Sequence, residues 1–233
     1  MYIVTGVSRG LGKAIVEQLL ANNETVIGIG RAHNIEHTNF SFVKCDLKDI
    51  AAIRNLNLPT FEDEVVLINN AAIIGEVKRI SDQKMLDLTE VLTVNTIAPA
   101  ELTKRIYDST LIKHTFKLIN ISSGAANRAI PSWAAYCASK ASLNMLTESF
   151  LAEEREKGNE VTAYAVSPGV IDTDMQEQIR EANPEDFSSL DNFKALHEND
   201  DLFSPQEAAN RLLKLISMPF TGEIKVDLRT IDL

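Results

Sequence analysis

The sequence predicts a doubly wound α/β fold, in which helices cover both faces of a mainly parallel β-sheet. Short apolar segments alternate with segments of helical periodicity from the first residues to the last. Repeated strand–helix–strand units of this kind give parallel strands joined by right-handed crossovers. A length of 233 residues, with no linker, repeat or low-complexity tract, fits one domain spanning residues 1–233.

Seven segments are predicted to be strands because each is a short, mostly apolar run. One of them, 65–68, has the sequence VVLI, which is typical of a strand buried on both faces. In chain order the predicted strands are 2–5, 25–29, 40–45, 65–68, 116–121, 161–166 and 224–228.

Five segments are predicted to be helices because their apolar residues recur at the spacing of one helix face. In chain order they are 11–21, 50–56, 83–107, 132–155 and 205–217. Pro99 is expected to kink the third helix. Gly158 is a suitable C-terminal cap for the fourth, and Ser204 followed by Pro205 is a typical helix start.

The composition is that of a soluble globular protein, with 45% apolar and 24% charged residues. The net charge of −10 and the lack of a basic stripe argue against nucleic acid as a partner. The apolar runs are too short to span a membrane, and Met1 leads directly into the first predicted strand. We therefore expect no leader segment, no membrane partner and a cytoplasmic location. Four histidines and two cysteines lack ligand or disulfide-framework spacing, so no metal site is expected.

A glycine-rich loop, TGVSRGLG (5–12), joins the first predicted strand to the first predicted helix. Glycines let backbone N–H groups approach a pyrophosphate, and the N-terminus of the following helix presents partial positive charge to it. Such a loop could be a simple tight turn, but its place after the first strand favours dinucleotide binding. The residues expected to contact the cofactor here are Gly6, Ser8, Arg9, Gly10, Leu11 and Gly12.

Two arginines favour NADPH over NADH as that dinucleotide. Folds that prefer NAD usually carry Asp or Glu after the second strand, where the acid binds the ribose 2′-OH. Here the corresponding position is Gly30, followed by Arg31, and Arg9 lies within the loop. A guanidinium can bind a 2′-phosphate that an acid would repel, so we expect Arg9 and Arg31 to select NADP(H).

Further segments extend this pattern in a consistent order: CDL (45–47), NNAA (69–72), VNTIAP (94–99), NISS (120–123), YCASK (136–140) and SPGVIDTDM (167–175). With them, the chain resembles the short-chain dehydrogenases/reductases over essentially its whole length. The resemblance implies a Rossmann-type fold and oxidoreductase activity. Ala72 departs from the family pattern, which usually has glycine there. The second half, including PGVIDTDMQEQIRE (168–181) and TGEIKVD (221–227), is similar to the sepiapterin reductases and benzil reductases.

The predicted catalytic residues are Ser123, Tyr136, Lys140 and Asn95. Tyr136 and Lys140 are four residues apart on one predicted helix and share a face. The ammonium is expected to lower the phenol pKa by about two units, or roughly 2.7 kcal/mol, so that Tyr136 serves as general acid toward a carbonyl oxygen. Ser123, after the fifth predicted strand, is expected to stabilise that oxygen. The resemblance implies that Lys140 also holds the nicotinamide ribose and that Asn95 anchors a proton-relaying water.

Other residues are expected along the cofactor because they follow predicted strands or match the family's segments. Those after the third strand should border the adenine, and those after the sixth should lie beside the nicotinamide. They are Asp46, Leu47, Asn70, Ala71, Ala72, Pro168, Gly169, Val170, Ile171 and Thr173, together with Tyr136 and Lys140.

The segment 175–204 is the candidate substrate lid because it is long, polar and acidic. Trp133 and Met175 are candidate substrate contacts, and Phe187, Phe193 and Phe203 are further candidates for an apolar pocket or for ordinary packing. Asp227 lies near the place where sepiapterin reductases hold the pterin edge with an acid.

The function these observations favour is NADPH-dependent reduction of a small ketone, a benzil-like diketone or a sepiapterin-like substrate. A reductase of 3-oxoacyl thioesters or sugars is an alternative within the family. A redox sensor that binds NADP(H) without turnover is an alternative from another class. The resemblance also implies a homodimer or homotetramer, with the predicted helices 83–107 and 132–155 at the interface.

Overall fold

The computed structural model describes the backbone of residues 1–233 and every side chain except that of His114. Its strands form one sheet of order β3-β2-β1-β4-β5-β6-β7, in which every neighbouring pair is parallel. The doubly wound, Rossmann-type fold predicted from the sequence is confirmed. The strands are β1 (Tyr2–Thr5), β2 (Val26–Gly30), β3 (Phe40–Lys44), β4 (Val65–Asn69), β5 (Phe116–Ile121), β6 (Thr162–Ser167) and β7 (Lys225–Asp227).

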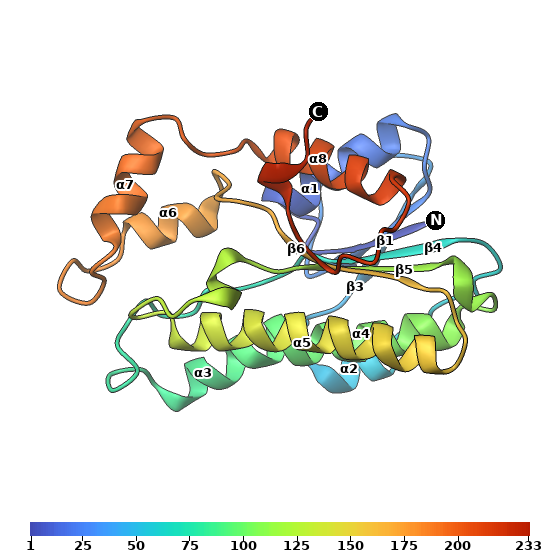
Figure 1. The fold of residues 1–233 in the computed structure, drawn as a ribbon, viewed down its shortest axis with the longest axis horizontal. Coiled ribbons are helices and arrows are strands. Elements are labelled where there is room, and N and C mark those ends of the chain that lie inside the picture. Colours follow the sequence, from blue (N-terminus) through green and yellow to red (C-terminus); the bar gives the residue numbers. More distant parts are fainter.

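Helices cover the two faces of this sheet (Figure 1). On one face lie α1 (Gly10–Ala21) and α8 (Pro205–Ser217), and on the other lie α2 (Ile50–Arg54), α4 (Ala98–Ser109) and α5 (Ala134–Glu156). α3 (Met85–Leu92) packs against α5. The short helices α6 (Asp174–Arg180) and α7 (Leu190–Glu198) project beyond these layers at the left of Figure 1.

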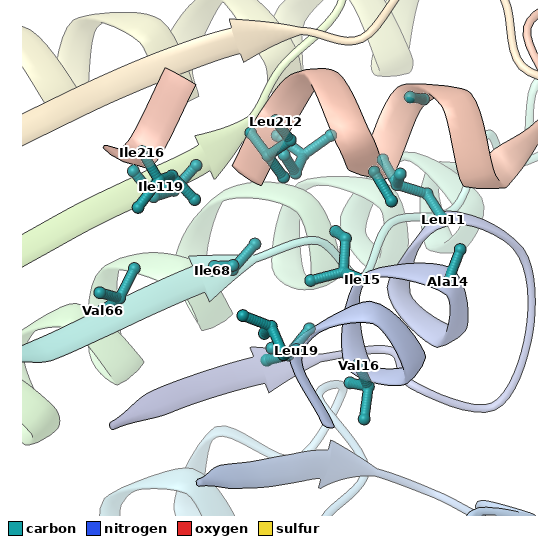
Figure 2. Packing of buried hydrophobic residues seen from close by; sticks show 14 of the residues in the cluster. Leu11, Ala14, Ile15, Val16, Leu19, Val66, Ile68, Ile119, Leu212 and Ile216 are labelled. Atoms are coloured by element: carbon teal, nitrogen blue, oxygen red, sulfur yellow. The ribbon is translucent and has the colours of Figure 1, made fainter. Parts of the chain in front are cut away.

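Alternation along the buried strands divides the core into two apolar layers. In β4, Val66 and Ile68 face α1 and α8, whereas Val65 and Leu67 face the opposite layer. Figure 2 shows the first layer, where Ile15 of α1 points toward the sheet with its neighbours from α1 and α8. The strand order reverses between β1 and β4, and a doubly wound sheet binds its ligands at the carboxyl ends of such a pair.

The segment 83–107, predicted to be one kinked helix, consists of two α-helices joined by a π-helical turn. α3 ends at Leu92, a π-helical turn spans Thr93–Ile97, and α4 then begins at Ala98. Pro99 has no N–H to donate to the carbonyl of Asn95 four residues earlier, so α-helical pairing cannot pass through Asn95. The irregular turn therefore lies before Pro99, and single π-turns of this kind are frequent at functional sites.

The bounds of the other predicted helices agree with the structure to within two residues, and those of α8 are the same. α5 begins at Ala134 instead of 132, because Ser132 has a left-handed φ of +71°. Gly158 follows the end of α5 with φ +78°, as its capping role requires, and the Ser204 side chain accepts a hydrogen bond from the Glu207 N–H at 3.1 Å. Among the described residues no helix is both long and apolar enough to cross a membrane, and no cluster of potential ligands is arranged to hold a metal ion.

Candidate active site

The glycine-rich loop after β1 has the conformation that its glycines permit. Gly6 and Gly10 have φ of +73° and +55°, where a side chain would be strained. A Cβ at Gly12 would lie well inside contact distance of the Gly6 carbonyl oxygen and the Asn70 side-chain amide. Ser8 is exposed and Leu11 is buried in the core under the loop. No Cβ therefore covers the loop backbone at Gly6, Gly10 and Gly12, where an anionic group would approach the N-terminus of α1.

Asn70 and Thr5 join the carboxyl ends of β4 and β1 at the reversal of strand order. The Thr5 hydroxyl oxygen accepts hydrogen bonds from the backbone N–H groups of Asn70 and Ala71, both at 3.0 Å. The Asn70 side-chain amide donates to the Thr5 carbonyl oxygen at 2.9 Å. Residues 70–72 are partly exposed beside the glycine loop, at the edge of the sheet where a doubly wound fold binds its ligand.

The two arginines predicted to select the cofactor are placed differently. Gly6 N–H donates to the Ile29 carbonyl at 2.9 Å, which holds the end of β2 against the loop and leaves Arg31 exposed just beyond it. Arg9 forms an ion pair with Asp174 at the start of α6, with both side chains more than half exposed. Thr173 lies beside Gly10, with its Cγ2 3.1 Å from the position of a Cβ there. The segment after β6 thus reaches back over the loop.

The remaining predicted cofactor positions lie at the carboxyl ends of β3 and β6. Leu47 is buried and Asp46 is exposed, with a carboxylate oxygen that accepts from the Lys48 N–H at 3.0 Å. Gly169 has φ +82° and lies against the Phe203 ring. Residues 170–171 run beside Phe203. The Phe203 backbone N–H donates to the Val170 carbonyl oxygen, and the Phe203 carbonyl oxygen accepts from the Asp172 N–H, both at 2.9 Å. Pro168 is buried.

Ser123, Tyr136 and Lys140 come together at the carboxyl end of β5. Ser123 hydrogen-bonds the Tyr136 phenol and accepts from the Ala125 N–H at 3.1 Å. Lys140 is 2% exposed, its Nζ lies 5.7 Å from the centroid of the Tyr136 ring, and it donates to the Ile121 carbonyl oxygen at 2.8 Å. The helical spacing that the sequence predicted therefore brings the phenol and the amine into one buried site.

The Tyr136 pKa moves in the direction opposite to the predicted lowering. Burial raises the pKa of Tyr136 to about 12, although the hydrogen bond to Ser123 acts in the opposite direction. Burial also lowers the pKa of Lys140 to about 7, so its ammonium is only partly present at neutral pH. Desolvation by burial is the largest cause of both shifts. Tyr136 is consequently a neutral phenol, which holds the proton that a general acid must give.

Asn95 lies in the π-turn and connects three segments of the site. Its side-chain amide donates to the Ile73 carbonyl at 2.8 Å and to the Ser139 hydroxyl at 3.1 Å, and its side-chain oxygen accepts from the Ile73 N–H at 2.9 Å. The side chain is fully buried, and both its amide nitrogen and its oxygen take part in these hydrogen bonds. Asn95 thus ties the strand-end wall to α5 one residue before Lys140, and its backbone carbonyl is the group that Pro99 leaves without an α-helical donor.

An aromatic cluster closes the site on the side of α6 and α7. Trp133 lies edge-on to Tyr136 with ring centroids 5.6 Å apart, and it stacks on Phe187 at 5.4 Å with an interplanar angle of 14°. Phe193 lies 5.1 Å from Trp133, and Met175 packs at the margin. Phe203 belongs elsewhere, since it packs in the α1–α8 layer under Arg211.

The family model for "short chain dehydrogenase" matches residues 1–184 of this chain. The chain belongs to the short-chain dehydrogenase family. It is 38% identical to benzil reductase ((S)-benzoin forming) of Bacillus cereus, over 97% of this chain and 98% of that protein. It is 28% identical to bovine sepiapterin reductase over 92% of this chain and 88% of that protein. The crystal structure of NADPH-bound carbonyl reductase from chicken fatty liver superposes with a TM-score of 0.75, at 25% identity over 100% and 97% of the two chains.

These matches confirm the predicted family and make the chain an oxidoreductase of the short-chain dehydrogenase family, which uses nicotinamide cofactors. The residues of the glycine loop fit a nicotinamide cofactor of this kind. The space beside Gly12 would be filled by any Cβ, and the positive φ angles at Gly6 and Gly10 keep the loop backbone open toward the crevice.

The short-chain dehydrogenase site also contains residues that the sequence did not reveal. Ser139 hydrogen-bonds Asn95, and Asp174 pairs with Arg9. The Ser132 hydroxyl donates to the Asp186 carbonyl, next to Phe187. Ser139 could have been noticed from its place between Tyr136 and Lys140, whereas contacts across 54 residues leave no local pattern.

Asp227 does not offer a free carboxylate to a substrate. It lies at the end of β7, where the Arg229 guanidinium forms a two-point ion pair with it. That pairing lowers the pKa of Asp227 below its ordinary value. The predicted pterin-holding acid is therefore engaged by its own chain.

Proposed function

We propose that this enzyme is an NADPH-dependent carbonyl reductase whose substrates are small apolar ketones, and diketones of the benzil type in particular. The observation that carries the proposal is the buried Tyr136 phenol, hydrogen-bonded to Ser123 with Lys140 behind it and an apolar aromatic cluster in front. The likeness to a benzil reductase supports the same substrate class. The engaged carboxylate of Asp227 favours a diketone over a pterin.

NADPH, when bound, supplies the hydride that reaches the carbonyl carbon. Tyr136 gives its phenolic proton to the carbonyl oxygen, and the Ser123 hydroxyl hydrogen-bonds the same oxygen as negative charge develops there. The phenolate that remains is stabilised by the Lys140 ammonium, which lies within 5.7 Å of the ring centroid. Lys140 can return a proton to Tyr136 because its lowered pKa of about 7 makes its proton easy to give.

The residues we propose along the cofactor are those of the loop, Arg9 and Arg31, and the strand-end segments after β3, β4 and β6. The candidate lid, 175–204, starts and ends near the bridge between Ile171 and Phe203. Closing this segment over the crevice would exclude water from the hydride and proton transfers.

The test of the function is a carbonyl panel followed by NADPH absorbance. We expect oxidation of NADPH with benzil, much slower oxidation of NADH, and little turnover of sepiapterin, acetoacetyl-CoA or a free sugar. If NADPH binds but no carbonyl compound oxidises it, the protein is a redox sensor. If the thioester or sugar is the best substrate, the diketone assignment is wrong.

Arg31→Ala should weaken NADPH binding about 10- to 100-fold and change NADH binding less than about twofold, because a bidentate contact to the 2′-phosphate is lost. Equilibrium titration of each dinucleotide would measure this without turnover. Arg54→Ala, an exposed arginine on α2, is the matched control. Equal losses for both dinucleotides would mean that the 2′-phosphate is recognised elsewhere.

We further propose that two copies associate through α4 and α5, as oligomers are common in the family. Ile97 beside α4 and Met145 and Leu146 on α5 leave large apolar side chains exposed, at 44%, 60% and 39%. Sedimentation should give a dimer or a tetramer, and Met145→Glu should shift it toward monomer. A wild-type monomer at micromolar concentration would contradict the proposal.

A further inference from the structure

One polar atom in the aromatic cluster has no partner. Trp133 is 6% exposed, its Nε1 is closed to solvent, and no acceptor among the described residues hydrogen-bonds it. Buried tryptophan N–H groups usually find a partner, and leaving one unpaired is unfavourable. A donor in this state beside a catalytic tyrosine is suited to a ligand oxygen.

The chain holds Trp133 in place with unusual local geometry. Ser132 adopts φ +71°, which is strained for a residue with a side chain, and its hydroxyl donates to the Asp186 carbonyl oxygen. This contact positions Phe187, whose ring stacks on Trp133 at an angle of 14°. The indole therefore stacks on a flat ring from the segment 175–204, and it also contacts Phe193 and, at a steep angle, the Tyr136 ring.

The same cluster has the chemistry of a pocket for a flat apolar group. Around Trp133 and Tyr136 its members include Ile74, Ile179 and Phe187, with the partly buried Phe193 packed against them. The parallel stack of Phe187 on Trp133 shows that a planar aromatic ring fits against the indole. A ligand bound here would present an aryl or other apolar substituent to the cluster and an oxygen to the buried N–H.

We infer that Trp133 is a specificity-determining residue, whose indole N–H binds the second oxygen of a vicinal dicarbonyl while Tyr136 and Ser123 bind the first. This inference rests on the proposed carbonyl reductase function and adds the residue that selects vicinal dicarbonyl substrates. In a 1,2-dicarbonyl the two oxygens are on adjacent carbons, so two neighbouring donors can hold both. A monoketone leaves the Trp133 donor unpaired, and sites built to hydrogen-bond a group discriminate strongly against analogues that lack it.

The test compares benzil with benzyl phenyl ketone, which has the same two aryl groups and only one carbonyl. Trp133→Phe keeps an aromatic wall but removes the N–H. We expect the ratio of kcat/KM for benzil to that for benzyl phenyl ketone to fall about tenfold in this variant. Because the ratio is compared between proteins, the greater intrinsic reactivity of benzil cancels.

Phe193→Leu is the matched control, since it alters the wall next to Trp133 but keeps the indole N–H, and its ratio should stay within about twofold of wild type. An unchanged ratio in Trp133→Phe would overturn the inference. A fall of the same size in Phe193→Leu would assign the discrimination to wall shape and would overturn it as well.

A second measurement needs no variant and no turnover. The chain contains a single tryptophan, so a ¹⁵N-labelled protein gives one indole N–H resonance. In the complex with NADP⁺, benzil should shift this proton downfield, and benzyl phenyl ketone should not. Equal shifts, or none, would refute the hydrogen bond. A wild-type protein that oxidises NADPH with neither ketone would instead contradict the proposed function, whatever the resonance shows.

Discussion

Tyr136→Phe is expected to lower kcat by about 10²- to 10⁴-fold, because the variant lacks the proton that the developing alkoxide needs. The phenol is buried and hydrogen-bonded to Ser123, and its raised pKa keeps it protonated across the physiological range. A phenylalanine ring retains the edge-on contact with Trp133, so the pocket keeps its shape. Initial rates with benzil under saturating NADPH would measure the loss.

The control for this variant is Tyr164→Phe, which removes a phenol from a buried position on β6 where the ring packs on Phe220. It should change kcat less than about twofold. NADPH affinity should also be nearly the same in Tyr136→Phe and wild type, because the cofactor loop is untouched. A Tyr136→Phe enzyme with full activity would rule out Tyr136 as the proton donor.

The sheet and its helices were predictable because their causes are local. The short, largely β-branched run VVLI at 65–68 lies in the buried strand β4, and Ser204 with Pro205 starts α8 as a capping pair should. The glycine loop was also predictable from the sequence, since three glycines follow the strand at positions that need a positive φ or leave no room for a Cβ.

The π-helical turn at Asn95 could not be predicted from the local sequence. A proline predicts a disturbance, and it was placed at Pro99 itself, but the disturbed pairing is four residues earlier. The choice of a π-turn depends on the side-chain contacts of Asn95 with Ile73 and Ser139, which lie 22 and 44 residues away. No pattern within the helix specifies those partners.

The electrostatics of the site were missed for a related reason. The i, i+4 spacing of Tyr136 and Lys140 correctly put both groups on one side of α5, but spacing carries no information about burial. Both side chains are enclosed by segments distant in sequence, and the resulting desolvation changes the direction of the Tyr136 shift. The aromatic lid contacts, such as Phe187 on Trp133, likewise depend on how 175–204 folds back.

Lys140 is expected to make the stability of the cofactor-free protein depend on pH. Its pKa is about 7 in the folded protein and near the ordinary 10.5 when unfolded, so between these values the unfolded chain binds a proton that the folded chain does not. The free energy of unfolding of wild type should therefore rise with pH over this window, by up to about 1.4 kcal/mol per unit and on the order of 5 kcal/mol in all. Below pH 7 both states carry the charge, and the full burial cost remains.

Lys140→Met removes this dependence. Urea unfolding of both proteins at pH 6, 8 and 10 should show the variant relatively most stable at pH 6, with its advantage shrinking as pH rises. Lys104→Met, at an exposed lysine on α4, should leave the wild-type slope unaltered. Parallel curves for wild type and Lys140→Met would contradict a lowered pKa. A lysine that costs the fold this much at neutral pH is best explained by the chemistry it serves, since a methionine of similar size would fill the same space without a charge.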